Sequence, residues 1–77
     1  MDMSIRAIRE REGISQMQLA TRAGVSLPVI SRMETGKPVQ SISFRVVCQA
    51  LGVDPDAVTG VNLYSGLRKA KKHASGD

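Results

Sequence analysis

The apolar residues of this chain recur at intervals of three and four positions, in short runs that each end near a glycine. This spacing lines up apolar side chains on one face of a helix, and a glycine after such a run is a common C-terminal stop. The first run, with Ile5 and Ile8, predicts a helix over about 4–12 that ends at Gly13. Two further runs, which end at Gly24 and Gly36, predict two more short helices in the first half of the chain.

Two serines indicate where the second and third helices begin. Ser15 is followed three positions later by Gln18, which is the sequence signature of a capping box. Ser26 is expected to cap the third helix, so that Pro28 becomes its second helical residue. A proline is tolerated there because the N–H groups of the first turn have no partner inside the helix. Both residues therefore predict the same start for the third helix.

The second half of the chain predicts two more helices. A fourth helix, capped by Ser41 or Ser43, is expected from residues that share one apolar face, namely Phe44, Val47, Cys48 and Leu51. Asp54 followed by Pro55 has the pattern of a cap and a first helical residue, which predicts a short fifth helix ending near Thr59. With one Phe, one Tyr and no Trp, the core must be aliphatic. The sequence thus predicts an all-α fold, a compact five-helix bundle.

The net charge suggests an anionic partner. The 77 residues suffice for one small domain, with a formal charge of +4 and an isoelectric point near 9.9. Nucleic acid is the first candidate partner and an acidic membrane the second, while a merely solubilising surface is the alternative. The single cysteine excludes an internal disulfide and fits a reducing, cytoplasmic setting. No apolar run approaches the roughly 20 residues of a membrane span.

We expect the chain to consist of a helical domain over residues 1–60 and a C-terminal extension over residues 61–77. The extension begins with apolar residues, among them Val61, Leu63, Tyr64 and Leu67, which Gly66 interrupts. The basic run Arg68–His73 follows, and we expect the last ten residues to be a mobile tail. The lysines of this tail either strengthen nucleic-acid binding without sequence preference or are simply solvated.

The segment 16–35 carries the most specific signal. Two helices of about two turns can cross near a right angle if a small residue lies at their contact and a glycine forms the turn, as Ala20 and Gly24 do here. The second of these helices is expected to bury Val25, Ile30 and Met33. Its opposite side then presents Leu27, Pro28, Ser31 and Arg32. A helix fits the major groove of B-DNA, so these four residues are the candidate base contacts, with Arg32 suited to guanine O6 and N7.

Residues 5–58 resemble the Cro/C1-type helix-turn-helix domain of phage lambda-type repressors, the XRE family. The matching runs are IRAIREREGISQMQLATRAGVSLPVISRMETGKPV and FRVVCQALGVDPDAV. The resemblance implies that the helix over about 27–35 enters the major groove, a docking geometry for which such repressors are standard examples. The family often has polar side chains where this chain has Leu27 and Pro28. Base selectivity would then either be weak or depend more on DNA shape.

The resemblance also implies roles for residues around the motif. Gln16, at the start of the second helix, would contact a DNA phosphate with help from Ser15. Further phosphate contacts would come from Thr35, Lys37, Ser41 and Ser43. Arg9 and Glu34 would form a structural ion pair between the first and third helices.

These expectations point to a bacterial or phage transcriptional regulator, by default a repressor, acting on double-stranded DNA in the cytoplasm. It would bind as a homodimer to an inverted repeat whose half-sites lie roughly 10 bp apart. Dimerisation would use the apolar extension or need DNA, because the fifth helix offers only Ala57 and Val58. One alternative is a helix-turn-helix fold turned to protein partners, such as an antitoxin-like or accessory regulator, which the apolar pair Leu27–Pro28 favours. Another is a membrane binder acting through residues 61–73.

No enzymatic chemistry is expected. The single histidine, His73, lies in the basic tail, and the sequence has no carboxylate pair, phosphate loop or metal-ligand cluster. Cys48 is expected to be a small buried hydrophobe, and Met17 and Met33 to be packing residues. We therefore expect no catalytic residue, no metal, no cofactor and no small-molecule ligand.

Overall fold

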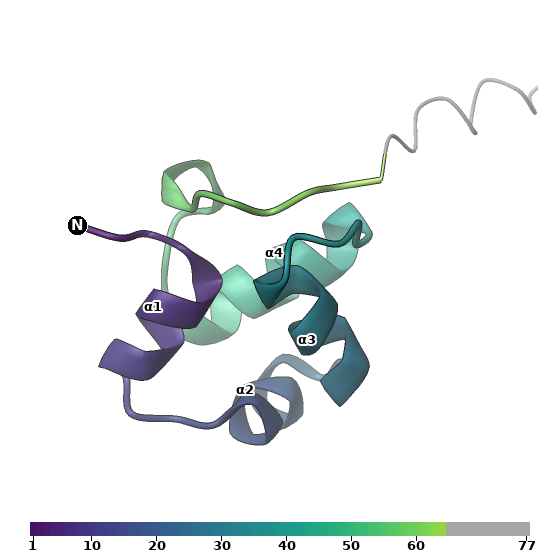
Figure 1. Cartoon of the computed structure of the whole chain (residues 1–77). Coiled ribbons are helices and arrows are strands. Elements are labelled where there is room, and N and C mark those ends of the chain that lie inside the picture. The colour runs from purple at the N-terminus through teal and green to yellow at the C-terminus, as the bar shows by residue number, and fades with distance from the viewer. Residues whose placement is uncertain (65–77) are drawn as a thin grey trace, which may run out of the picture.

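A computed structural model describes residues 1–64 of the chain, and these form a small helical body (Figure 1). Its elements are the helices α1 (Ile5–Arg11), α2 (Gln16–Ala23), α3 (Leu27–Glu34) and α4 (Ser41–Leu51), followed by the 3-10 turn η1 (Pro55–Ala57). The all-α prediction is confirmed within the described residues. The expected basic tail, His73 and Leu67 lie outside them.

The expected fifth helix is only one turn of 3-10 helix. Asp54 caps it as predicted, with its carboxylate accepting a hydrogen bond from the Asp56 N–H at 2.9 Å. The turn ends at Val58, whose backbone is extended (φ −83°, ψ 138°). The extended chain then bonds to the N-terminal segment, where the Thr59 N–H donates to the Met3 carbonyl at 3.0 Å. The chain therefore leaves the helical path after one turn.

The predicted starts of α2 and α3 agree with the structure, and the predicted start of α4 does not. The capping box of Ser15 and Gln18 is present at α2. Ser26 occupies the N-cap of α3, although its side chain accepts no capping hydrogen bond. The prediction that Ser41 or Ser43 caps α4 is wrong, because Gln40 is the N-cap and both serines lie inside the first turn. Val39 pairs with Leu63 as an isolated parallel bridge, so extended backbone runs up to Gln40 and the helix begins directly after it.

The core lies between the four helices. α2 packs against both α3 and α4, and Ala20 is buried at this contact as expected. The buried apolar residues are Ile5, Ile8, Ile14, Leu19, Ala20, Ile30, Met33, Val39, Phe44, Val47, Cys48 and Leu51. The packing role of Met33 is confirmed, whereas that of Met17 is wrong, because Met17 is 57% exposed. It follows the N-cap of α2 by two positions, and the core-facing positions of α2 are taken by Leu19 and Ala20.

Residues 58–64, here called the strap, run over the helices from η1 to the turn between α3 and α4, with a bend at Gly60 (Figure 1). At its far end the strap pairs with Val39, whose N–H donates to the Asn62 carbonyl at 2.9 Å. The Tyr64 N–H in turn donates to the Val39 carbonyl at 2.9 Å. The strap thus joins the N-terminal segment to the turn that follows α3. In the described part of the chain, no helix is long and apolar enough to span a membrane.

Candidate nucleic-acid interface

The turn between α2 and α3 is built from Gly24 and Val25. Gly24 has a left-handed backbone (φ 74°), which a glycine adopts without the strain of a side chain. Its N–H and that of Val25 both donate to the Ala20 carbonyl, at 2.9 and 3.0 Å. These bonds close α2 and turn the chain directly into α3. Two short helices joined by this tight turn are the framework of a helix-turn-helix.

The first five residues of α3 include three of the four predicted base-contact residues. Pro28 and Ser31 are exposed, and Leu27 is half-buried. Ile30 and Met33 face the core, with exposed fractions of 0% and 2%. Ile30 and Met33 thus anchor one side of the helix while the other side stays open to solvent. The exposed Met17 at the start of α2 is a further apolar residue that the sequence analysis did not place at the surface.

Arg32, the fourth predicted base contact, lies in a different environment. Its Nε and Nη2 groups donate to the Pro38 carbonyl at 3.2 and 2.7 Å, and Nη2 also donates to the Tyr64 hydroxyl at 3.3 Å. The side chain is half-buried. In this arrangement the guanidinium holds the turn after α3 and the end of the strap. The Tyr64 contact could not be predicted from the sequence, because the two residues are far apart in the chain and only the strap brings them together.

An ion pair fixes the C-terminal end of α3 to α1. Arg9 and Glu34 form a bidentate contact, with Nε–Oε2 at 2.6 Å and Nη2–Oε1 at 3.1 Å. The side chains are 11% and 4% exposed, so the pair is largely shielded from solvent but not fully buried. Arg9 also donates to the Ile14 carbonyl at 2.9 Å, which ties the pair to the loop before α2. The contact expected from the family resemblance is thus formed.

Gln16 belongs to the same network. Its side-chain amide donates to Glu34 Oε1 at 3.0 Å. Burial by itself raises the pKa of Glu34, but the hydrogen bonds from Arg9 and Gln16, together with the Arg9 charge, outweigh it and lower this pKa. The hydrogen bond to Glu34 is also the main cause of the raised pKa of Arg9. Gln16 therefore holds α2 against α3, at the position where the resemblance implies a phosphate contact.

The other expected phosphate contacts lie at three helix ends, the start of α2, the end of α3 and the start of α4. The Ser15 hydroxyl is occupied as a cap, accepting from the Gln18 N–H at 3.0 Å. The Thr35 hydroxyl donates to the Ser31 carbonyl at 2.8 Å, and Lys37 is exposed just beyond it. In the first turn of α4, Ser41 is exposed and Ser43 is half-buried. Lys37 thus provides an exposed cation directly after α3.

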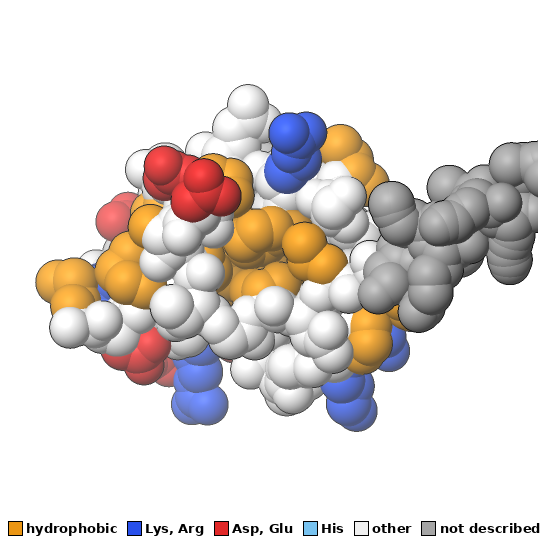
Figure 2. All heavy atoms as spheres, turned by 90° about the horizontal axis from the view of Figure 1, so that it is seen from above, with side chains coloured by type: hydrophobic (Ala, Val, Ile, Leu, Met, Phe, Trp, Pro, Cys, Tyr) orange, Lys and Arg blue, Asp and Glu red, His pale blue; other side chains and the backbone are white. Residues whose placement is uncertain are grey.

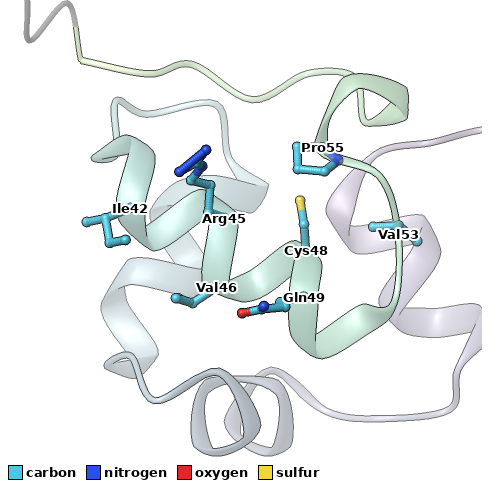
Figure 3. Close-up of a pocket in the computed structure, with 7 residues that line it drawn as sticks. All are labelled: Ile42, Arg45, Val46, Cys48, Gln49, Val53 and Pro55. Carbon is cyan, nitrogen blue, oxygen red and sulfur yellow. The ribbon is translucent and has the colours of Figure 1, made fainter.

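A shallow apolar hollow lies between α4 and η1. Its volume is about 370 Å³, and its lining residues are Ile42, Arg45, Val46, Cys48, Gln49, Val53 and Pro55 (Figure 3). The Cys48 thiol points toward Pro55, and burial, followed by the nearby Asp54 charge, raises its pKa to about 11. Figure 2 shows hydrophobic side chains in the middle of the upper side of the molecule, with acidic and basic side chains at its margins. The expectation that Cys48 is a buried hydrophobe is confirmed, with 1% of the residue exposed.

The family comparison agrees with this geometry. A family model described as a helix-turn-helix domain matches residues 4–60, which cover α1 to η1. The chain therefore belongs to the helix-turn-helix domain family, of the Cro/C1/XRE type. Neither the curated proteins nor the solved structures contain a match to this chain. The family suggests a DNA-binding regulator.

Proposed function

We propose that this protein is a sequence-specific DNA-binding transcriptional regulator that inserts α3 into the major groove of double-stranded DNA. The observation that carries the proposal is the α2–α3 unit, in which Gly24 forms the turn and Pro28 and Ser31 remain exposed on the outer face. The major groove of B-DNA is wide enough to admit such a helix, and the residues near its N-terminus reach the base edges.

The proposed base contacts are Leu27, Pro28, Ser31 and Arg32. Leu27 and Pro28 are suited to thymine methyl groups, and the Ser31 hydroxyl to a base edge or a phosphate. Arg32 would act through Nη1, since its Nε and Nη2 donate to Pro38. The proposed phosphate contacts are Ser15, Gln16, Thr35, Lys37, Ser41 and Ser43.

We propose further that the protein represses transcription as a homodimer on an inverted repeat, with half-sites roughly 10 bp apart. Repression is the simplest outcome because a protein bound over a promoter blocks it without any additional contact. The same proposal places the protein in the cytoplasm of a bacterium or of a phage-infected cell. Residues 1–60 would form the DNA-binding domain, and residues 61–77 its extension.

A second candidate is a helix-turn-helix surface that binds a protein partner. It is favoured by exposed apolar residues of the helix-turn-helix, since Pro28 of α3 is exposed and Met17 of α2 is 57% exposed. A hydrophobic protein contact changes little with salt, whereas binding through several phosphates weakens steeply with the logarithm of salt concentration. Salt dependence therefore separates the two candidates.

The deciding experiment is selection from a pool of random duplexes, washed at two salt concentrations and sequenced. Enrichment of a palindrome is the expected result, and Ser31→Ala should change the base preferred at one position of each half-site. Gln49→Ala, at an exposed position of α4, is the matched control and should select the wild-type palindrome. Recovery of no preferred sequence by the wild-type protein would overturn the proposal.

A further inference from the structure

The guanidinium of Arg32 is held along one edge. Its Nε and Nη2 groups both donate to the Pro38 carbonyl, at 3.2 and 2.7 Å, and Nη2 also donates to the Tyr64 hydroxyl at 3.3 Å. No buried side-chain nitrogen or oxygen among residues 1–64 lacks a hydrogen-bond partner, so Nη1, which bonds to none of these residues, reaches solvent. One edge of the guanidinium is therefore occupied, while Nη1 remains available to a ligand.

The two acceptors of Arg32 restrain its side chain in different ways. The bonds from Nε and Nη2 to the Pro38 carbonyl meet at a single oxygen, about which a planar guanidinium can still swivel. The Tyr64 hydroxyl supplies a second fixed point, on the other hydrogen of Nη2. An arginine side chain has many rotamers, and fixing them before binding reduces the entropy that binding must otherwise remove.

The backbone places Tyr64 beside the C-terminal end of α3 without help from its hydroxyl. The Tyr64 N–H donates to the Val39 carbonyl at 2.9 Å, and the Val39 N–H donates to the Asn62 carbonyl at 2.9 Å. The Asn62 side chain also donates to the Gly36 carbonyl, at 3.4 Å. The strap thus crosses from η1 to the turn after α3 (Figure 1) and carries the phenol to a helix 32 positions earlier in the chain. Removal of the hydroxyl alone leaves the backbone bonds in place.

From these contacts we infer that Tyr64 is a positioning residue for DNA recognition, which orients the Arg32 guanidinium so that Nη1 meets a base edge in the major groove. The inference deepens the proposed function and rests on it. Contact of an arginine with guanine O6 and N7 is the commonest specific contact in this groove. A donor held in place discriminates between base pairs, because a loose side chain shifts to another acceptor. Tyr64 thus acts on base preference through Arg32, without itself contacting DNA.

The first test measures how Tyr64 affects the half-site position that Arg32 contacts. The full-length protein is bound to the selected palindrome and to duplexes with one base pair changed, and Arg32→Ala identifies the position whose preference depends on Arg32. Tyr64→Phe removes only the hydroxyl. It should reduce the preference at that position by roughly 2- to 10-fold, which corresponds to the ordering of one long side chain, and leave the other positions unchanged.

Asn62→Ala is the matched control. Asn62 also lies in the strap and donates a side-chain hydrogen bond near the end of α3, but it bonds to the Gly36 carbonyl and not to Arg32. This variant should keep the wild-type preference at every position. The double variant Arg32→Ala/Tyr64→Phe should have the preference of Arg32→Ala alone. Equal effects of Tyr64→Phe and Asn62→Ala at every position would overturn the inference, because the strap would then serve the fold only.

The second test observes the arginine itself in the absence of DNA. The Nε–H signal of Arg32 is assigned by its disappearance in Arg32→Ala, and its relaxation in nuclear magnetic resonance gives the order parameter of the side chain. This order parameter should fall in Tyr64→Phe and keep its wild-type value in Asn62→Ala. An unchanged value in Tyr64→Phe would contradict the inference, since Pro38 alone would then fix the guanidinium.

The remaining outcomes separate this inference from the proposed function. If the wild-type protein selects no palindrome, the proposed function fails, and the role of Tyr64 in base preference fails with it. If a palindrome is selected and Tyr64→Phe keeps the wild-type preference, the proposed function stands and the inference is wrong. An increased preference in Tyr64→Phe would also refute it, because the hydroxyl would then hold Arg32 away from DNA. Equal weakening of all sequences by Arg32→Ala would show that Arg32 contacts no base, which leaves Tyr64 nothing to orient.

Discussion

The two ends of α3 differ in how their side chains are held. At the C-terminal end, Arg32 bonds to Pro38 and Glu34 bonds to Arg9, both outside the helix, and the Thr35 hydroxyl donates to the Ser31 carbonyl of the helix itself. At the N-terminal end, Pro28 and Ser31 are exposed. One end of the helix fixes its position and the other is available to a ligand. A helix that must present side chains to a groove in a set register needs such an anchor, because small displacements weaken directional contacts. The predictions below test this division.

The largest loss of stability is expected from Glu34→Ala. The substitution removes the bidentate partner of the partly buried Arg9 guanidinium. Breaking a fully buried pair costs about 3–5 kcal/mol, which is the upper limit of the loss expected here. Glu10→Ala removes the exposed pair with Arg6 and should cost about 0.5 kcal/mol or less. Urea unfolding of both variants measures the difference. Similar losses in the two variants would show that the anchored end does not depend on the pair of Arg9 and Glu34.

Acid should weaken the same anchor. The pKa of Glu34 in the folded protein is lowered from its ordinary value of 4.5. The Glu34 carboxylate therefore binds a proton more readily in the unfolded chain than in the folded protein. The stability that this carboxylate contributes is therefore present above about pH 4.5 and is lost as the pH falls through the lower, folded-state pKa. Urea midpoints between pH 3 and pH 7 should fall less steeply in Glu34→Gln than in the wild type. A parallel fall would exclude Glu34 as a source of the acid sensitivity.

Arg32→Ala should have an intermediate effect on stability, about 1–3 kcal/mol, because it removes the charged donor of the Pro38 carbonyl. Its effect on DNA binding separates two roles. If Arg32 contacts a base through Nη1, the variant loses most of its sequence preference. If Arg32 only positions the turn that carries Lys37, binding weakens equally for all sequences. Selection from a random pool, repeated with this variant, distinguishes them.

A smaller loss is expected from Gly24→Ala in the turn between α2 and α3. An added Cβ would meet no atom within 4 Å, so the cost comes from the left-handed backbone alone. That cost is about 1–2 kcal/mol for a residue with a side chain. Gly24→Asn should cost less, since Asn tolerates this conformation better. Thermal unfolding of both variants checks the order, and a neutral Gly24→Ala would contradict it.

The smallest stability change, within about 0.5 kcal/mol, is expected from Ser31→Ala at the available end of α3. The same variant should still lose base preference on DNA. Unchanged stability together with altered base preference is expected of a surface residue that contacts DNA. If the variant is destabilised and its base preference is unchanged, Ser31 has a structural role like that of the C-terminal end of α3.

Much of the fold could be predicted because its signals are local. The capping box at Ser15, the glycine turn at Gly24 and the buried stripe of Ile30 and Met33 each depend on residues a few positions apart. The helix-turn-helix and its outer face followed from them. Met17 was misplaced because a single apolar residue near a helix start fits either a buried or an exposed position, and only packing decides between them.

Contacts between residues far apart in the chain depend on the folded structure. The sequence predicted the four helices and the turn from local signals, and the pairing of Arg9 with Glu34 through resemblance to a family. It could not show that Arg32 bonds to Pro38 and Tyr64, that Gly36 and Val39 hold the strap, or that α4 starts after Gln40. The physical reason is that non-helical segments such as 58–64 have no periodic signal of their own. Their path depends on the backbone partners that the folded helices leave available.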